Sequence, residues 1–151
     1  MRPDDMSKRA EAVTIRLARL DEHQALEALQ RRASLALPEY RAQLLANPDA
    51  IELPIGQIEN GGVLVAEMGA RLAGFAALAG SELDGLFVEP DLWRKGIGGA
   101  LVEAATHQAR RAGLTVTVIA SPGARGFYER CGFIVEGDEQ TRFGPAIKMS
   151  R

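Results

Sequence analysis

A glycine-rich turn between a predicted strand and a predicted helix constrains most strongly what this chain can fold into and bind. In WRKGIGGAL, residues 93–101, three of the four positions from Gly96 to Gly99 are glycine, and Arg94 and Lys95 precede them. A glycine inside a helix lowers stability by about 0.5–1 kcal/mol relative to alanine, so three glycines at the start of a helix require a structural or functional explanation. Backbone N–H groups at a helix N-terminus form a ready site for an anion. The turn therefore predicts a cradle for a pyrophosphate group.

The order of predicted elements favours an α+β fold with one mixed, mostly antiparallel sheet flanked by helices. Alternating or continuous apolar patterns predict strands, and apolar residues at helical spacing predict helices. Asp21 with Gln24 resembles a capping box at the start of the first helix. The two strands on either side of the helix that follows the glycine turn should pair in parallel. The predicted strands are 13–20, 61–69, 71–80, 82–90, 114–120, 133–138 and 145–150, and the predicted helices are 21–36, 38–47, 98–112 and a short one ending at Gly132.

Composition limits the function classes. The 151 residues, 46% hydrophobic and 25% charged, suit one folded domain over 13–151 after a flexible polar tail at 1–12. A net charge of −2 argues against a nucleic-acid binder, and the single cysteine, Cys131, excludes an internal disulfide. No apolar run reaches the roughly 18 residues of a membrane span, and the N-terminus lacks a signal-peptide core. We expect a cytoplasmic protein with no metal site and no nucleic-acid or membrane partner.

Two common phosphate-binding motifs do not match the turn. A P-loop requires GxxxxGK[ST], and no such string follows a predicted strand. A dinucleotide fingerprint requires GxGxxG, and Leu101 stands where the third glycine should be. The acidic residue that should follow about 20 positions later is also missing. Another phosphate ligand is therefore expected.

The stretch FVEPDLWRKGIGGALVEAA, followed by a β-branched strand and ARGFYERCGF, resembles the GCN5-related N-acetyltransferases. The resemblance extends over nearly the whole chain from about Val13. It implies acetyl-coenzyme A as cosubstrate, with the pyrophosphate on a [QR]xxGx[GA] loop. Gly96 and Gly98 match that pattern, whereas Trp93 departs from it at the first position. The coenzyme-binding residues implied are Leu86, Phe87, Val88, Arg94, Lys95, Gly96, Ile97, Gly98, Gly99, Ala100, Ser121, Arg125 and Tyr128.

The resemblance also implies how the coenzyme arm lies. The acetyl-pantetheine arm would run along strand 82–90 and bond to the main chain of Leu86 and Val88. A bulge near Phe87 would free these groups, and the N–H of Val88 would stabilise the oxyanion. Ser121 occupies the place where many relatives carry an asparagine. Arg125 would meet a phosphate, the alternative being an ordinary exposed arginine.

Tyr128 is the candidate general acid, because the resemblance places a tyrosine opposite the coenzyme sulfur. A phenol with an ordinary pKa near 10 stays protonated at neutral pH and can donate to a developing thiolate. The alternative is a half-buried core tyrosine, and neighbouring Phe127 is predicted to be a core residue.

Glu82 and Asp84 are the candidate general bases. An unbulged strand would place both on one face with Leu86 and Val88. Histone-type members of the family carry a glutamate base at the position of Glu82. The alternative is that one or both are solvated charges at the end of a strand.

The acceptor is the least defined part of the prediction. Helices 21–36 and 38–47, with the loop to residue 60, should build its site, and Phe143 is a candidate wall of the acceptor tunnel. The leading hypothesis is direct acetyl transfer to a primary amine of a small molecule or peptide, without an acyl-enzyme. The alternative is a non-catalytic acyl-CoA-binding sensor on the same fold. Relatives often dimerise, so a homodimer is also expected from the resemblance.

Overall fold

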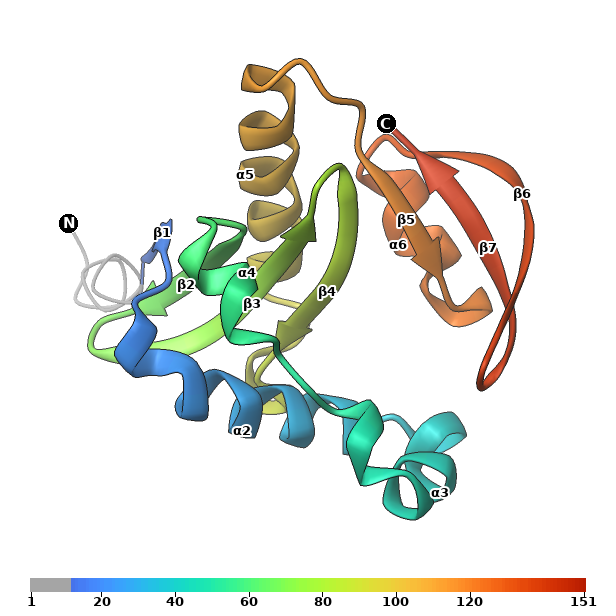
Figure 1. Cartoon of the computed structure of the whole chain (residues 1–151), viewed down its shortest axis with the longest axis horizontal. Coiled ribbons are helices and arrows are strands. Elements are labelled where there is room, and N and C mark those ends of the chain that lie inside the picture. The colour runs from blue at the N-terminus through green and yellow to red at the C-terminus, as the bar shows by residue number, and fades with distance from the viewer. Residues whose placement is uncertain (1–11) are drawn as a thin grey trace, which may run out of the picture.

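The strands form one seven-stranded sheet in the order β1-β2-β3-β4-β5-β7-β6 (Figure 1). The computed structural model describes residues 12–151, so the predicted tail lies outside the described residues except for Ala12. Only β4 and β5 pair in parallel among the described strands, which confirms the mixed, mostly antiparallel sheet. The strands are β1 Val13–Leu17, β2 Val63–Met68, β3 Arg71–Ala79, β4 Glu82–Val88, β5 Thr117–Ala120, β6 Ile134–Thr141 and β7 Gly144–Ser150.

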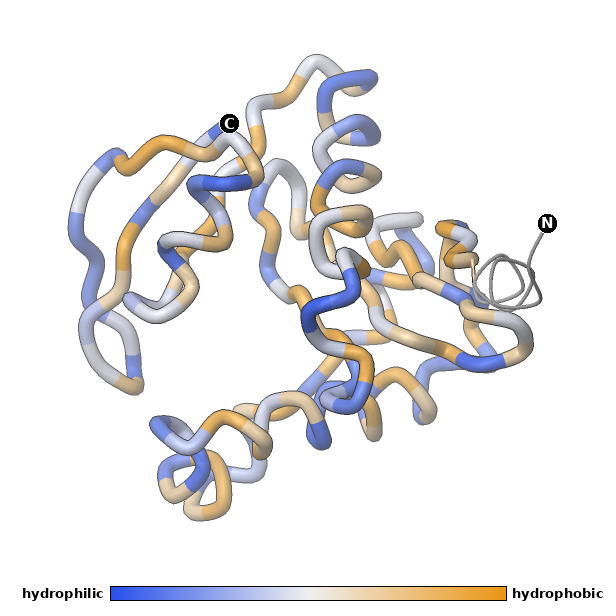
Figure 2. The backbone as a smooth tube through the Cα atoms, turned by 180° about the vertical axis from the view of Figure 1, so that it is seen from behind, coloured by the Kyte–Doolittle hydropathy of each residue, from blue (hydrophilic) through white to orange (hydrophobic). Residues whose placement is uncertain are grey.

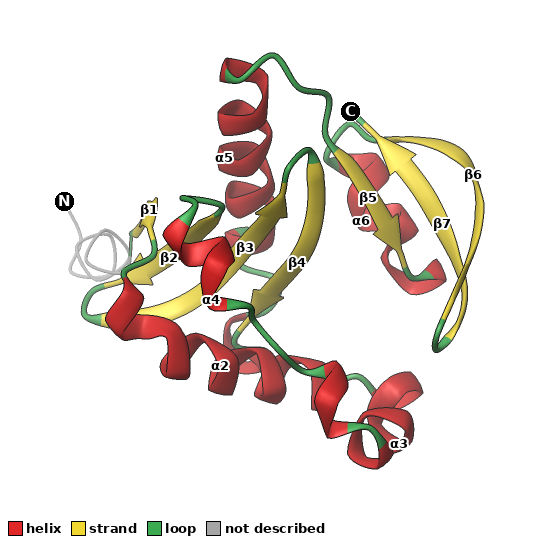
Figure 3. Cartoon of the chain, in the orientation of Figure 1, coloured by secondary structure: helices red, strands yellow, loops and turns green. Residues whose placement is uncertain are grey.

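The helices follow the predicted order, with one addition (Figure 3). The predicted cap at Asp21 and Gln24 is wrong, because a 3₁₀ turn, Leu20–Glu22, precedes the first helix. In that turn the Glu22 carboxylate accepts a hydrogen bond from the N–H of Arg19 at 2.8 Å. The added helix, α4, has five residues, too few to show a 3.6-residue pattern. The helices are α2 His23–Leu35, α3 Pro38–Ala46, α4 Ile55–Glu59, α5 Ile97–Arg111 and α6 Arg125–Arg130.

Helices cover both faces of the sheet (Figure 1). Phe75 of β3 packs into an apolar cluster with α2 and α4, whereas its neighbour Ala76 packs into a second cluster with α5 and α6. Successive side chains of a strand point to opposite faces, so the buried part of β3, residues 73–78, must be apolar on both faces. Apolar and polar stretches alternate along the turns of α5, as expected for a helix with one buried side (Figure 2).

Strand β4 carries a bulge, but not where it was predicted. Ala77 pairs with Gly85 and Leu78 with Leu83, which leaves Asp84 without a partner. The bulge therefore lies at Asp84, and the prediction of a bulge near Phe87 is wrong. It also breaks the expected alternation: Leu83 and Leu86 both pack against the α5 side of the core. One shared face for Glu82, Asp84, Leu86 and Val88 was expected of an unbulged strand, and the bulge removes that condition.

No helix in the described part of the chain is long and apolar enough to cross a membrane.

Candidate active site

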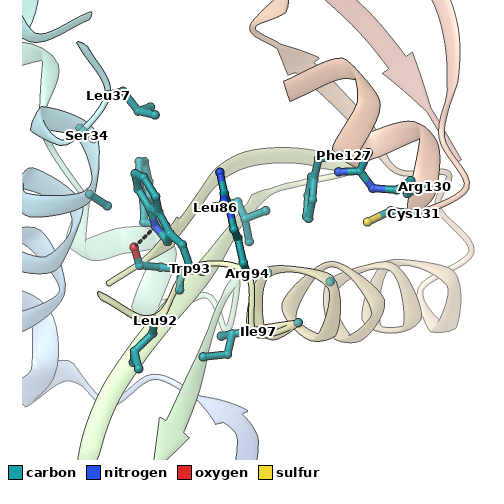
Figure 4. A pocket seen from close by; sticks show the side chains of 16 residues that line it. Ser34, Leu37, Leu86, Leu92, Trp93, Arg94, Ile97, Phe127, Arg130 and Cys131 are labelled. Carbon is teal, nitrogen blue, oxygen red and sulfur yellow. Dashed lines mark hydrogen bonds between the residues drawn. The ribbon is translucent and has the colours of Figure 1, made fainter. Parts of the chain in front are cut away.

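A cleft of about 710 Å³ opens beside the end of β4 (Figure 4). Leu86, Phe87 and Val88 of β4 form one wall, and the glycine turn with the start of α5 forms another. The end of α2 and residues of α6 complete the lining. β4 and β5 share one register pair, Glu82 with Thr117, so the strands are not paired where the cleft lies. The cleft thus occupies the place where two parallel strands separate.

The glycine turn presents unpaired N–H groups to this cleft. Gly96 precedes α5 with a φ of 82°, a left-handed conformation that glycine adopts without strain. The first intrahelical bond of α5 runs from the N–H of Ala100 to the carbonyl of Gly96 at 3.1 Å. The N–H groups of Ile97, Gly98 and Gly99 therefore have no partner within the helix. This is the arrangement expected of an anion cradle.

Packing inside the protein does not explain two of the glycines. A Cβ added at Gly99 would meet no atom within 4 Å, and one added at Gly98 would lie 3.4 Å from the ring of Phe127, an ordinary contact. Neither residue needs a left-handed φ. Without side chains, both positions leave the backbone open to the close approach of a ligand.

Positive charge gathers around the turn. Arg94 and Arg130 line the cleft from the turn and from α6, and neither forms an ion pair within residues 12–151. Lys95, with Ala100, lines a smaller hollow of about 360 Å³ on the other side of the turn. The helix N-terminus adds roughly half a positive charge. Arg130 was not predicted; the only signal was a cation two residues after the predicted acid.

The other predicted phosphate contact lies elsewhere. Arg125 pairs with Glu129 of the same helix at 3.3 Å, and both side chains are about half exposed. Arg125 lines neither hollow, and Ser121, which precedes a 3₁₀ turn after β5, lines neither of them either.

The main chain of β4 is open toward the cleft. The N–H of Glu89 donates to the carbonyl of Ala73 on β3 at 2.9 Å. Main-chain groups of an antiparallel strand alternate between its two edges, so those of Leu86 and Val88 point away from β3. With β5 diverging, the N–H of Val88 faces the cleft.

Trp93 contacts this open edge. Its indole N–H donates to the carbonyl of Val88 at 2.8 Å, and its ring lines the cleft near Ser34 and Leu37 (Figure 4). The sequence marked Trp93 only as a departure from the family pattern. Its bond to β4 could not be foreseen.

Tyr128 lies in the core beside the cleft. Its ring makes edge contacts with Phe127 at 5.0 Å and Phe133 at 5.4 Å between centroids, and the residue is 7% exposed. Burial raises the pKa of the Tyr128 hydroxyl above its usual value, and the nearby Cys131 thiol raises it further. Phe127 and Cys131 line the cleft, whereas Tyr128 is not part of its lining. Phe127 thus combines its predicted core role with a place in the cleft wall.

The two candidate bases also lie outside the lining of the cleft. Asp84, at the bulge, is exposed and accepts a hydrogen bond from Gln57 of α4 at 3.1 Å. Glu82 is partly buried at the register pair with β5. No group of three metal-ligating side chains occurs in the described part of the chain.

A polar contact ties the β6–β7 turn to the segment after α3. Arg142 donates to Asp49 at 3.1 Å and to Asn47 at 3.0 Å, and its guanidinium lies 5.2 Å from the centre of the Phe143 ring. Phe143 itself does not line the cleft.

Comparison with known proteins gives the same fold and family. A family model described as "Acetyltransferase (GNAT) domain" matches residues 37–150. The peptidyl-lysine N-acetyltransferase YjaB of Salmonella typhimurium is 35% identical over 133 residues, 83% of this chain and 86% of that protein.

Solved structures agree with this match. The solution structure of apo YjaB from Escherichia coli has a TM-score of 0.68 at 27% identity, covering 92% of this chain and 97% of that one. The PaiA N-acetyltransferase of Thermoplasma acidophilum, solved with coenzyme A, has a TM-score of 0.73 at 21% identity, covering 93% and 98%, and shows the fold. The predicted resemblance is confirmed: this chain belongs to the GNAT family and is an acetyl-CoA-dependent N-acetyltransferase.

Proposed function

We propose that the protein transfers the acetyl group of acetyl-CoA directly to the side-chain amine of a lysine in a peptide. The family supplies the reaction, and the relatives named peptidyl-lysine N-acetyltransferases support the choice of acceptor. The observation that carries the proposal is the open edge of β4 beside the unpaired N–H groups of α5.

In the proposed complex the N–H groups of Ile97, Gly98 and Gly99 hold the pyrophosphate. Arg94 and Arg130 add positive charge from either side of the cleft. The pantetheine arm then lies along β4 and bonds to the main chain of Leu86 and Val88, as an added strand would.

The reaction needs a neutral amine, an oxyanion donor and a protonated leaving group. A lysine ammonium, with a pKa of about 10.4, must first lose a proton to a base. Its nitrogen then bonds to the acetyl carbon, the carbonyl oxygen becomes anionic, and the N–H of Val88 stabilises that charge. The carbon–sulfur bond breaks as the Tyr128 hydroxyl donates its proton to the thiolate, and the second proton that the amine nitrogen loses as the amide forms restores the phenol. The raised pKa of Tyr128 means that its hydroxyl is protonated at neutral pH.

Glu82 is the proposed base, acting through water because it does not line the cleft. Asp84 is the weaker candidate, since Gln57 already donates to its carboxylate on the side of the sheet that α4 covers.

One observation bears on the alternative raised by the sequence, an acyl-CoA sensor without turnover. Tyr128, Glu82 and Asp84 all stand back from the lining of the cleft. A sensor would bind acetyl-CoA tightly without consuming it, and Tyr128→Phe would change nothing.

Thiol release from acetyl-CoA separates the two functions. The acceptors are lysine-containing peptides, single amino acids and small amines, with Tyr128→Phe as the control. Turnover on lysine peptides, much reduced in the control, supports the proposal. Turnover restricted to small amines contradicts the peptide acceptor. Binding of acetyl-CoA without turnover on any acceptor favours the sensor.

A further inference from the structure

We infer that Trp93 is a positioning residue. Its indole N–H holds the end of β4 in the orientation that the acetyl transfer needs, and its ring lines the cleft that would hold the coenzyme. The inference rests on the proposed function, because it concerns the main-chain groups that would meet the acetyl arm.

The peptide unit between Val88 and Glu89 is held from both sides. Its carbonyl accepts the Trp93 indole N–H at 2.8 Å, and its N–H donates to the Ala73 carbonyl at 2.9 Å. The Glu89 side chain is held in turn by two bonds from the Arg32 guanidinium, at 3.0 and 2.8 Å. This unit cannot rotate without losing at least one of these bonds.

The constraint reaches the proposed oxyanion donor. The N–H of Val88 belongs to the preceding peptide unit, whose other residue, Phe87, is paired with Phe75 of β3. The donor therefore lies between two anchored points, the β3 pairing on one side and the Trp93 bond on the other. A donor held in place beforehand costs no reorganisation when charge develops.

The ring of Trp93 is not part of the hydrophobic core. It is 39% exposed and belongs to neither apolar cluster of the described residues. Instead it lines the cleft, where the figure shows it between the end of β4 and the side chains of Ser34 and Leu37 (Figure 4).

Two variants test the positioning role. Trp93→Phe keeps an aromatic ring but removes the donor, and Trp93→Gln restores a donor without the ring. We expect Trp93→Phe to lower kcat for a lysine peptide about tenfold, with KM for acetyl-CoA within about twofold of wild type, because the loss affects geometry in the transition state. Trp93→Gln should recover most of kcat. A wild-type kcat in Trp93→Phe, or no recovery in Trp93→Gln, overturns the inference.

The ring can be followed directly, since the chain contains one tryptophan. Titration of the wild type with coenzyme A should change the tryptophan emission saturably. An unchanged emission, with binding shown by calorimetry, would place the ring away from the coenzyme and overturn its role as a wall. If the wild type acetylates no amine, the proposed function fails, and the titration still decides whether Trp93 borders the coenzyme.

Discussion

Glu82 of β4 faces Thr117 of β5, and in the described part of the chain this is the one register pair that the two parallel strands share. Beyond it the strands separate, and the cleft opens along the main chain of Leu86 and Val88. The bulge at Asp84 falls between the paired end and the open end of β4. β4 therefore joins β5 in the sheet at its first residue and has an unpaired edge, facing the cleft, at its last residues.

Gly98→Glu should weaken acetyl-CoA binding by about 100-fold or more, because a carboxylate would face the pyrophosphate. Gly98→Ala is the matched control: its Cβ has room beside Phe127, and the backbone N–H is kept. Calorimetric titration with acetyl-CoA measures both. An affinity equal to that of the wild type in both variants would remove the pyrophosphate from this turn.

Arg130→Ala should raise the dissociation constant for acetyl-CoA about fivefold and make that constant less dependent on salt concentration. The reason is that the substitution removes one unpaired positive charge from the lining of the cleft. Arg125→Ala is the comparison, since Arg125 pairs with Glu129 and lines no part of the cleft. Binding measured at two ionic strengths decides which arginine meets the coenzyme. A larger effect for Arg125→Ala would support the phosphate contact predicted from the sequence.

Tyr128→Phe should reduce the slope with which the free energy of unfolding falls as pH rises into the alkaline range. The folded-state pKa of Tyr128 is raised, so its contribution is complete below the unfolded-state pKa near 10 and falls as pH rises beyond it. The wild type should lose about 1.4 kcal/mol of unfolding free energy per pH unit above that point for this one proton. Urea denaturation between pH 8 and 11 measures the slope, and Tyr40→Phe controls for loss of a phenol. Identical slopes in wild type and Tyr128→Phe would contradict the burial of this hydroxyl.

Arg32→Ala should lower the free energy of unfolding by about 1–2 kcal/mol, because it leaves the Glu89 carboxylate, 8% exposed, without its partner. This expected loss of unfolding free energy is small for a buried ion pair, because the Arg32 side chain is about half exposed. Arg31→Ala removes the neighbouring exposed charge and should change stability by less than about 0.5 kcal/mol. Urea denaturation at pH 7 compares the two, and equal losses would show that the ion pair does not stabilise the fold.

Short-range patterns determined most of the fold. Pro38 at the start of α3, the turn after Met68 with Gly69 at a φ of 62°, and Gly96 before α5 each express a backbone preference of one residue. Apolar periodicity located the strands, and the glycine turn predicted a phosphate-binding element and, through its resemblance to a family, the reaction. These features depend on neighbours in the chain, which is why the sequence alone carries them.

The site itself depended on contacts between distant residues. The bulge at Asp84 arises from the register between β3 and β4, and it placed Asp84 beside Gln57 rather than with Leu86. The place of Arg130 in the cleft and the bond from Trp93 to Val88 follow from how α6 and the glycine turn pack around β4. Register and packing are set by many weak interactions summed over the whole fold, so no local pattern records them. The sequence determined which groups can bind and react, and the tertiary structure decided which of them face the cleft.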